Sequence, residues 1–326
     1  MSRRARLLNV LAMLVGLSLM AVMCAKIGWG EVRSYLHTVG WGFALLFAIA
    51  SAAALCESTA LWIAIGRGAP LWRVMGIAQG GAAVNSFTPL GEGGEVIKWN
   101  FLRQHARDED VVSGILVWNL FYRLTKYALI FVAPLLVLLA HPDLFAPRQL
   151  WLVEGAAALS FIPSVVFAIL VWRGSAQIVV HLVQRIPFLR SRTPERRIEK
   201  ARRADEQLRV FLRSHRRDAL KAMALLFSAR LLSALELYAA VRLLGADMDV
   251  LVAVFLYGGT MVVSIYLSAF PVQIGVSEAG QYLFFGLVGL PPSLGFAQGF
   301  VRRLRILLSN ALGFAYIGYE SFRHRP

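Results

Sequence analysis

Charged residues are scarce in this chain of 326 residues, since Asp, Glu, Lys and Arg together make up only 16%. A soluble domain usually carries about 25%. Apolar residues make up 58%, and they recur in runs of about 20, the length that crosses the hydrocarbon core of a bilayer. This composition excludes an ordinary soluble domain and predicts an all-α polytopic membrane protein with about seven or eight transmembrane helices.

Chemically reactive motifs are also absent from the sequence. The two cysteines, Cys24 and Cys56, lie in apolar runs, and the six histidines are scattered. We therefore expect neither a disulfide framework nor a metal site. There is no dinucleotide fingerprint, phosphate-binding loop or catalytic constellation. We expect no cofactor and no catalysis, and without an ATP-binding motif any transport would be passive or ion-coupled.

The positive charge, +15 in total, is unevenly distributed. Twelve Lys or Arg and four Asp or Glu lie between Arg185 and Arg217. Such a block can bind nucleic acid, but in a membrane protein it is more typical of a cytoplasmic loop that faces anionic lipid headgroups. We therefore expect this basic block to contact anionic lipid headgroups and not nucleic acid.

The apolar runs divide the chain into two membrane halves, 1–172 and 219–326, joined by a basic linker, 173–218. Arg3, Arg4 and Arg6 precede the first run and predict a cytoplasmic N-terminus in a bacterial inner membrane. We expect that run to be an uncleaved span. The predicted spans are Leu7–Ala25, Trp41–Ile65, Val111–Leu139, Leu150–Trp172, Ala219–Leu244, Val250–Ala269 and Ser293–Tyr319.

Two apolar segments, 74–96 and 271–290, contain helix breakers and glutamates at membrane depth. The breakers are Pro89, Gly91, Pro271 and Gly275, and the glutamates are Glu92, Glu95 and Glu278. Broken helices survive at that depth only beside protein or water, and an ionisable residue there indicates a functional site. Their corresponding positions in the two halves favour an internal two-fold repeat with a transporter-like binding site.

The two broken segments differ in how they are expected to run. Segment 74–96 is predicted to enter the membrane and return on the same side. Segment 271–290 either crosses or returns, and we favour a crossing, because this places the basic tail Arg323–Arg325 in the cytoplasm.

The neighbouring helices carry buried cations in stripes. Asn119, Arg123 and Lys126 follow the spacing i, i+4, i+7, and Arg302 and Arg305 follow i, i+3, so each set lies on one helix face. Another predicted span contains Arg230 and Glu236, which cannot share a face and need separate partners. The candidate substrate-binding residues are Asn85, Glu92, Glu95, Asn119, Arg123, Lys126, Arg230, Glu236, Glu278, Arg302 and Arg305.

Cations exceed anions among these buried groups. With Arg303 there are six cations, against Glu92, Glu95, Glu236 and Glu278. The surplus suits an anionic ligand, and the planar fork of arginine favours phosphate. A lipid headgroup is the natural source of a phosphate in this location. The simpler interpretation is an internal network of salt bridges without a ligand.

The pattern Asn85-x3-Pro89-x-Gly91-Glu92, a helix with Arg123, then Pro271-x3-Gly275-x2-Glu278 and Arg302 resembles the membrane region of lysylphosphatidylglycerol synthases. This flippase-like family includes stand-alone proteins, one branch of which is associated with hopanoid biosynthesis. The resemblance covers roughly 7–319. It implies re-entrant helices and lipid translocation across the cytoplasmic membrane.

The chain also departs from that pattern. The full synthases carry an added aminoacyl-transferase domain, which is not expected here, and family members often have an acidic residue where this chain has Tyr122. We therefore expect a lipid flippase that binds an anionic or zwitterionic headgroup in a central polar cavity. The alternative is a component of lipid modification, acting on hopanoids, aminoacyl lipids or glycolipids.

Overall fold

The computed structural model describes residues 29–88, 93–144, 215–266 and 276–323. Several sequence predictions lie outside these described residues. They are the spans Leu7–Ala25 and Leu150–Trp172, almost all of the linker 173–218, and the residues Pro89, Gly91, Glu92, Pro271 and Gly275. The division of the chain into two halves and a linker therefore stays a prediction.

The described residues are helical, with no strand among them. The helices are α2 (Trp29–Val39), α3 (Gly42–Ala64), α4 (Leu71–Phe87), α5 (Gly93–Leu102), α6 (Asp108–Ala140), α11 (Arg216–Leu243), α12 (Val250–Tyr266), α13 (Val276–Leu287) and α14 (Pro292–Arg323), with a short 3-10 turn η2 (Pro142–Leu144). The predicted all-α class is confirmed.

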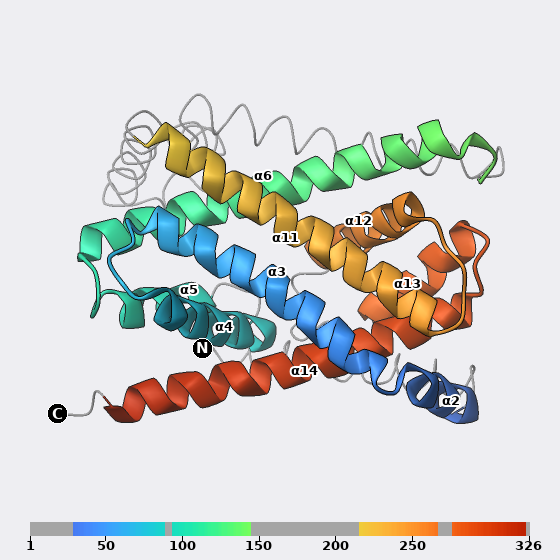
Figure 1. Cartoon of the computed structure of the whole chain (residues 1–326), viewed down its shortest axis with the longest axis horizontal. Helices are drawn as coiled ribbons and strands as arrows, with labels where there is room; N and C mark the ends of the chain where they lie inside the picture. Colours follow the sequence, from blue (N-terminus) through green and yellow to red (C-terminus); the bar gives the residue numbers. More distant parts are fainter. Residues whose placement is uncertain (1–28, 89–92, 145–214, 267–275, 324–326) are drawn as a thin grey trace, which may run out of the picture.

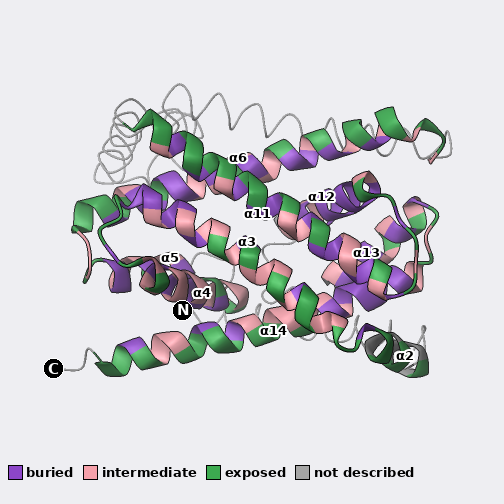
Figure 2. Ribbon diagram, viewed as in Figure 1, coloured by how far each residue is buried: buried purple, intermediate pink, exposed green. Residues whose placement is uncertain are grey.

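Three of the described helices, α3, α6 and α11, are long and apolar enough to cross a membrane. Their sequences are dominated by Ala, Leu and other good helix formers. At the start of α6, the carboxylates of Asp108, Glu109 and Asp110 lie in the first turn, where they interact favourably with the helix dipole. Large apolar side chains of α6, α11 and α14 remain exposed, and Figure 2 shows exposed positions along these three helices.

The α4 and α5 helices form a tight antiparallel hairpin. A Cβ on Gly94 would overlap the carbonyl oxygen of Gly81, so the two backbones touch. The side chains of Asn85 and Thr88 accept hydrogen bonds from the first N–H groups of α5, at Gly94 and Gly93. The α4 and α5 helices are therefore the two arms of a hairpin, and side chains at the end of α4 cap the start of α5. That segment 74–96 enters a membrane and returns on the same side stays a prediction.

The two helices on either side of the second break, α12 and α13, also pack against each other in antiparallel orientation, and the crossing of 271–290 stays a prediction. Gly259 on α12 faces the ring of Phe284 on α13, while Val263 faces Gly280. This pairing requires α13 to run back along α12. Hydropathy did not show the reversal because α12 is as apolar as a spanning helix, although it has only 17 residues.

The α3 and α11 helices lie side by side in antiparallel orientation along their full lengths (Figure 1). Gly42 packs against Leu243 at one end, and Arg67, just beyond α3, pairs with Asp218 at the other. Glu57 and Arg230 meet between these two points. This helix pair forms the centre of the molecule.

The two halves repeat with an offset of 179 positions. Both ends of α12 lie 179 positions after those of α4 (250 − 71 and 266 − 87). The ends of α3 and α11, at 64 and 243, show the same offset. Because the equivalent helices α3 and α11 are antiparallel, the second half is inverted relative to the first.

Polar side chains keep the same offset. Glu57 on α3 corresponds to Glu236 on α11. The stripe on α6 corresponds to a stripe on α14, so that Asn119, Arg123 and Lys126 are matched by Gln298, Arg302 and Arg305. The predicted internal repeat therefore extends to the charged residues.

Each hairpin packs on the long helix of the other half. Gly80 on α4 lies against Gly313 on α14, and Gly258 on α12 lies against Ala133 on α6. Figure 1 shows the result, with α6 and α14 on opposite sides of the antiparallel α3–α11 pair. Two buried apolar clusters form, one around α4, α5 and the start of α6, the other around α12 and α13.

Candidate functional site

A cavity of about 640 Å³ lies between α3, α4 and α14, and its inner end reaches α6, α11 and α12. Along α3, α6 and α11 the residues at this inner end fall between the two apolar clusters. The repeat places the centre of the molecule here. The charged lining residues are Glu57, Arg230, Glu236, Arg302 and Arg305.

Arg230 is the most deeply buried cation of the cavity, with 4% of its surface exposed. Its Nη1 lies 3.2 Å from Glu57 Oε1, and its guanidinium lies 3.9 Å from the centre of the Tyr122 ring. Its Nε and Nη2 have no hydrogen-bond partner among the described residues. Since a buried donor without a partner is costly, these two groups are suited to an acceptor brought by a ligand.

Arg305 and Glu236 form a second pair across the cavity wall. The Nε and Nη2 atoms of Arg305 donate to the two carboxylate oxygens of Glu236 at 2.9 and 3.1 Å. This bidentate geometry is the strong form of an Arg–carboxylate contact. The sequence-based expectation that Arg230 and Glu236 need separate partners is confirmed.

Arg302 differs from these two arginines because it has no carboxylate partner in the described part of the chain. Its Nη1 donates a long hydrogen bond of 3.5 Å to Thr260 Oγ1, and its guanidinium lies 5.8 Å from the centre of the Tyr257 ring. The cavity thus contains three arginines and two glutamates, and the uncompensated charge is on Arg302.

Most of the other lining residues are apolar, although Gln79, Ser86 and Asn310 also line the cavity. Phe47, Ala50 and Ala54 line the α3 side, and Met75 and Leu312 line the α4 and α14 sides. A polar, cationic inner end beside an apolar wall matches the two parts of an amphiphile.

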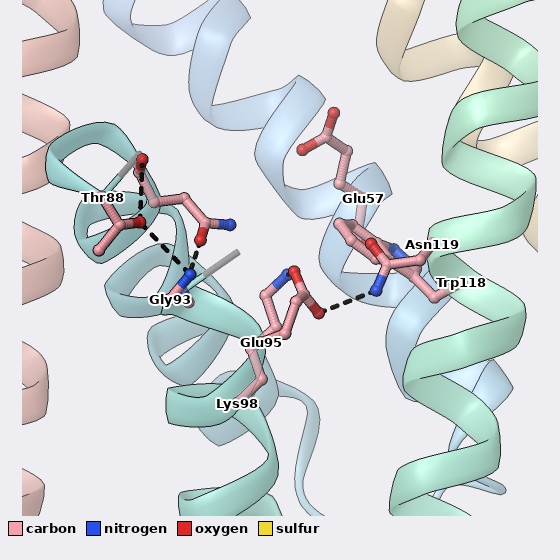
Figure 3. A network of polar contacts seen from close by, with 9 residues as sticks. Glu57, Thr88, Gly93, Glu95, Lys98, Trp118 and Asn119 are labelled. Atoms are coloured by element: carbon pink, nitrogen blue, oxygen red, sulfur yellow. Dashed lines mark hydrogen bonds and ion pairs between the residues drawn. The ribbon is translucent and has the colours of Figure 1, made fainter. Parts of the chain in front are cut away.

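A separate polar network joins the first hairpin to α6 (Figure 3). Glu95 accepts hydrogen bonds from Lys98 Nζ at 3.0 Å and from Asn119 Nδ2 at 2.9 Å. The Lys98 ammonium lies 4.1 Å from the centre of the Trp118 ring, whose N–H donates to the carbonyl oxygen of Glu57. The network therefore links α5 and α6 to the helix that carries Glu57.

A buried glutamate near the start of α13 is also paired. Glu278, 1% exposed, accepts a hydrogen bond of 2.9 Å from Arg303 Nε. Gln281 and Gln298 are buried near it. Glu278 thus fixes α13 on α14, as Glu95 fixes α5 on α6.

The predicted site residues fall into three groups. Four of them line the cavity, namely Arg230, Glu236, Arg302 and Arg305. Four others, Asn85, Glu95, Asn119 and Glu278, hold the hairpins. Arg123 and Lys126 do not line the cavity. Arg123 is exposed, and Lys126 is half-buried. Lys126 is nevertheless close enough to Arg230 and Arg302 for their charges to interact.

Two charged residues of the site were missed from the sequence. Glu57 lies in the middle of the predicted span Trp41–Ile65, and an acidic residue at that depth was a sufficient signal. Lys98 is not among the residues singled out from the sequence, yet it is 3% exposed and paired with Glu95. Its i, i+3 spacing from Glu95 is the signal that indicates the pair.

Comparison with known proteins identifies one family. A family model described as lysylphosphatidylglycerol synthase TM region matches residues 9–313. Neither a curated protein nor a solved structure matches the chain. Among the described residues, no group of three or more His, Cys, Asp or Glu side chains is placed to hold a metal ion.

Proposed function

Because the chain belongs to the lysylphosphatidylglycerol synthase TM-region family, we propose that it is a flippase, which carries a lipid headgroup across the membrane through the cavity between α3, α4 and α14. Membership of the family relates the chain to membrane lipids. The choice of translocation over modification rests on the cavity itself, as set out below.

The observation that carries the proposal is the unbalanced charge at the inner end of the cavity. Arg302 has no carboxylate partner in the described chain. The Nε and Nη2 groups of Arg230 have no hydrogen-bond acceptor among the described residues. An anionic oxygen placed between them would supply the missing acceptors. Since two cations at membrane depth are costly unless paired or hydrated, the site favours a headgroup that contains a phosphate.

The carboxylates of the cavity support binding over catalysis. Glu57 is paired with Arg230, and Glu236 is held by both nitrogens of Arg305. A general acid or base must be free to exchange a proton with a substrate, whereas both carboxylates are already engaged by arginine side chains. A zwitterionic headgroup would place its ammonium near Glu57, the more exposed of the two.

The distribution of charge at the ends of the bundle supports an orientation. Arg67, Arg103 and Arg107 gather at the end where α4 begins, and Asp247 and Asp249 lie at the end where α12 begins. The positive-inside rule assigns the first end to the cytoplasm. The proposal therefore places the protein in the cytoplasmic membrane with the N-terminus inside, and its cavity runs along the hairpin that enters from the cytoplasm.

Lipid movement is testable with purified protein in liposomes. The probe is phosphatidylglycerol with a fluorescent acyl chain, and dithionite quenching reports its arrival in the outer leaflet. Arg302→Gln is expected to slow this movement about ten-fold or more, because a hydrogen bond to a charged group contributes about 1.5–3 kcal/mol. Arg323→Gln, an exposed position at the end of the same helix, is the matched control and should behave as wild type.

Two results would contradict the proposal. The first is wild-type movement of the probe by Arg302→Gln. The second is a deletion strain that loses a lipid species while the leaflet distribution of its remaining lipids is unchanged. The second result would assign the protein to lipid modification, the alternative considered from the sequence.

A further inference from the structure

Three cations from three different helices meet at the inner end of the cavity. Arg230 on α11 and Arg302 on α14 line the cavity itself. Lys126 on α6 lies one helical turn beyond the cavity-lining Tyr122, on the same helix face, and the charges of both arginines act on its ammonium group. Like charges within range of one another at membrane depth are costly unless an anion lies among them.

The carboxylates of the cavity offset only part of this charge. Two carboxylates line the cavity in the described part of the chain, Glu57 and Glu236. Glu236 is held by both nitrogens of Arg305, and Glu57 pairs with Arg230. One of the three cations of the cluster is therefore offset by a lining carboxylate. The two remaining positive charges suit a ligand that carries two negative charges.

Aromatic rings lie against the guanidinium groups of the two arginines. The Arg230 guanidinium lies 3.9 Å from the centre of the Tyr122 ring, and that of Arg302 lies 5.8 Å from the centre of the Tyr257 ring. A ring on the face of a guanidinium leaves its N–H groups available, because these donate in the plane of the group. The edges of the two arginines are therefore the parts that can bind a ligand.

The Nε–Nη2 edge of Arg230 is shaped for two oxygens of one anion. These two nitrogens have no hydrogen-bond acceptor among the described residues, and Arg230 is 4% exposed. The same two atoms of Arg305 donate to both carboxylate oxygens of Glu236, at 2.9 and 3.1 Å. Arg230 can hold two oxygens of a phosphate in the same way, which leaves a further oxygen for Arg302.

The number of oxygens separates two kinds of lipid phosphate. A phosphodiester has two oxygens outside the ester bonds and a single negative charge. A terminal phosphate has three such oxygens and a charge of about −1.5 to −2 near pH 7. The terminal phosphate therefore supplies two oxygens to Arg230 and a third to Arg302, and its charge balances the two surplus cations.

We propose that the inner end of the cavity binds a terminal phosphate, a phosphomonoester at the end of a lipid headgroup, through the Nε–Nη2 edge of Arg230 and the guanidinium of Arg302. Lys126 acts on this phosphate through its charge and not by contact, since it does not line the cavity. The inference rests on the proposed function for the lipid part of the ligand and not for the phosphate.

Binding to the purified protein in detergent tests the proposal without any movement of lipid. The probes are dihexanoyl phosphatidic acid, which has a terminal phosphate, and dihexanoyl phosphatidylglycerol, which has a phosphodiester and the same acyl chains. At pH 8, isothermal titration should show about ten-fold tighter binding of phosphatidic acid, because its phosphate accepts one more charge-assisted hydrogen bond. Equal affinities for the two probes would overturn the proposal.

The preference should also depend on the charge of the phosphate. At pH 5, below the second pKa of a phosphomonoester of about 6, the preference for phosphatidic acid should fall to about three-fold or less. The ratio of the two affinities cancels changes in the protein that affect both probes. A preference of the same size at both pH values would assign it to the size of the headgroup and overturn the proposal.

Inorganic phosphate separates a lipid site from a site for the free anion. It should bind at least about ten-fold more weakly than phosphatidic acid, because it has no apolar part to contact the apolar lining residues. An affinity equal to that of phosphatidic acid would assign the site to free phosphate and overturn the lipid part of the proposal.

Lys126→Gln tests the surplus charge. Because the Coulomb energy is proportional to the charge of the ligand, this change should weaken binding of phosphatidic acid by about ten-fold and that of phosphatidylglycerol by about three-fold. Lys221→Gln is the matched control, since Lys221 is exposed on α11 and lies outside the cavity. An unchanged preference in Lys126→Gln would overturn the role given to its charge.

The binding assay and the liposome assay can fail separately. If phosphatidic acid binds with the expected preference but the wild-type protein moves no lipid, the proposed function fails and the phosphate site stands. If the protein moves lipid but binds the two probes equally, the proposed function stands and this inference fails.

Discussion

Glu57 and Arg230, on two antiparallel helices from different halves of the chain, meet at 3.2 Å at the centre of the molecule. Arg230 is 4% exposed, and Glu57 faces the cavity. This pair joins the two halves at the point where the ligand is expected to bind. Its contribution to stability is measured by unfolding, separately from its contribution to lipid movement.

Arg230→Met is expected to destabilise the protein by about 3 kcal/mol, because removing one partner leaves an uncompensated charge in a low-dielectric site. Adding Glu57→Gln should recover most of this loss. Thermal unfolding in detergent measures both effects. Arg242→Met is the control on the same helix, since its pair with Asp247 is exposed and contributes less than about 1 kcal/mol. Additive losses in the double variant would show that the pair is not coupled.

Gly313→Ala and Gly318→Ala should change stability in opposite directions, although both lie in α14. A Cβ on Gly313 would lie 2.7 Å from the carbonyl oxygen of Gln79, whereas a Cβ on Gly318 would meet nothing within 4 Å. The first change should destabilise by about 1–3 kcal/mol through overpacking. The second should stabilise by about 0.5–1 kcal/mol, because alanine favours the helix. Equal melting temperatures for the two variants would refute the close contact of α4 with α14.

Asn85→Ala should loosen the first hairpin, because the Asn85 side chain accepts the hydrogen bond from Gly94 N–H at 2.6 Å. Loss of such a cap costs about 0.5–2 kcal/mol. Asn85→Asp retains an acceptor and is the rescue variant. Hydrogen exchange of the α5 amides is the measurement, and unchanged protection in Asn85→Ala would show that the cap does not hold the turn.

Asp249 should make the stability of α12 depend on pH. Its carboxylate accepts a hydrogen bond of 2.7 Å from Leu251 N–H, and this bond, with the nearby His141, lowers the pKa of Asp249 below its ordinary value. A lowered folded-state pKa contributes stability that is complete above the unfolded pKa of about 3.9 and is lost as pH falls through the folded value.

The wild-type protein should therefore lose part of its stability below about pH 4, and Asp249→Asn should not show this part of the decrease. The difference between the two unfolding curves isolates the residue, since other carboxylates titrate in both proteins. Parallel curves from pH 6 to pH 3 would assign no capping role to the charged form.

The sequence predicted the helices well because long apolar runs bounded by charges leave few alternatives in a membrane. The break in the first segment was predicted for the same reason, since Pro89 and the glycines after it interrupt a run too short for two spans. The antiparallel packing of α12 and α13 was not predicted, because a 17-residue helix that turns back has the same hydropathy as one that crosses. Only packing, such as that of Gly280 on Val263, distinguishes them.

The site was predicted in part. Charge at membrane depth identified Arg230, Glu236, Arg302 and Arg305, all of which line the cavity. Their pairing depends on which helices are neighbours in space, and this is set by the inverted repeat. The same limit explains Arg123, which has the spacing of a cavity residue but does not line the cavity.

The contact of α4 with α14 also has a consequence for biosynthesis. The first hairpin leaves the ribosome early, whereas α14, the helix that receives its glycine face, is made about 200 residues later. Until α14 is made, the glycine face of the first hairpin lies in the insertion machinery or in lipid without its native neighbour. Contacts between such distant parts of a chain form slowly. Truncations that remove α14 should therefore leave a nascent chain that quality-control proteases recognise, even though every earlier helix is intact.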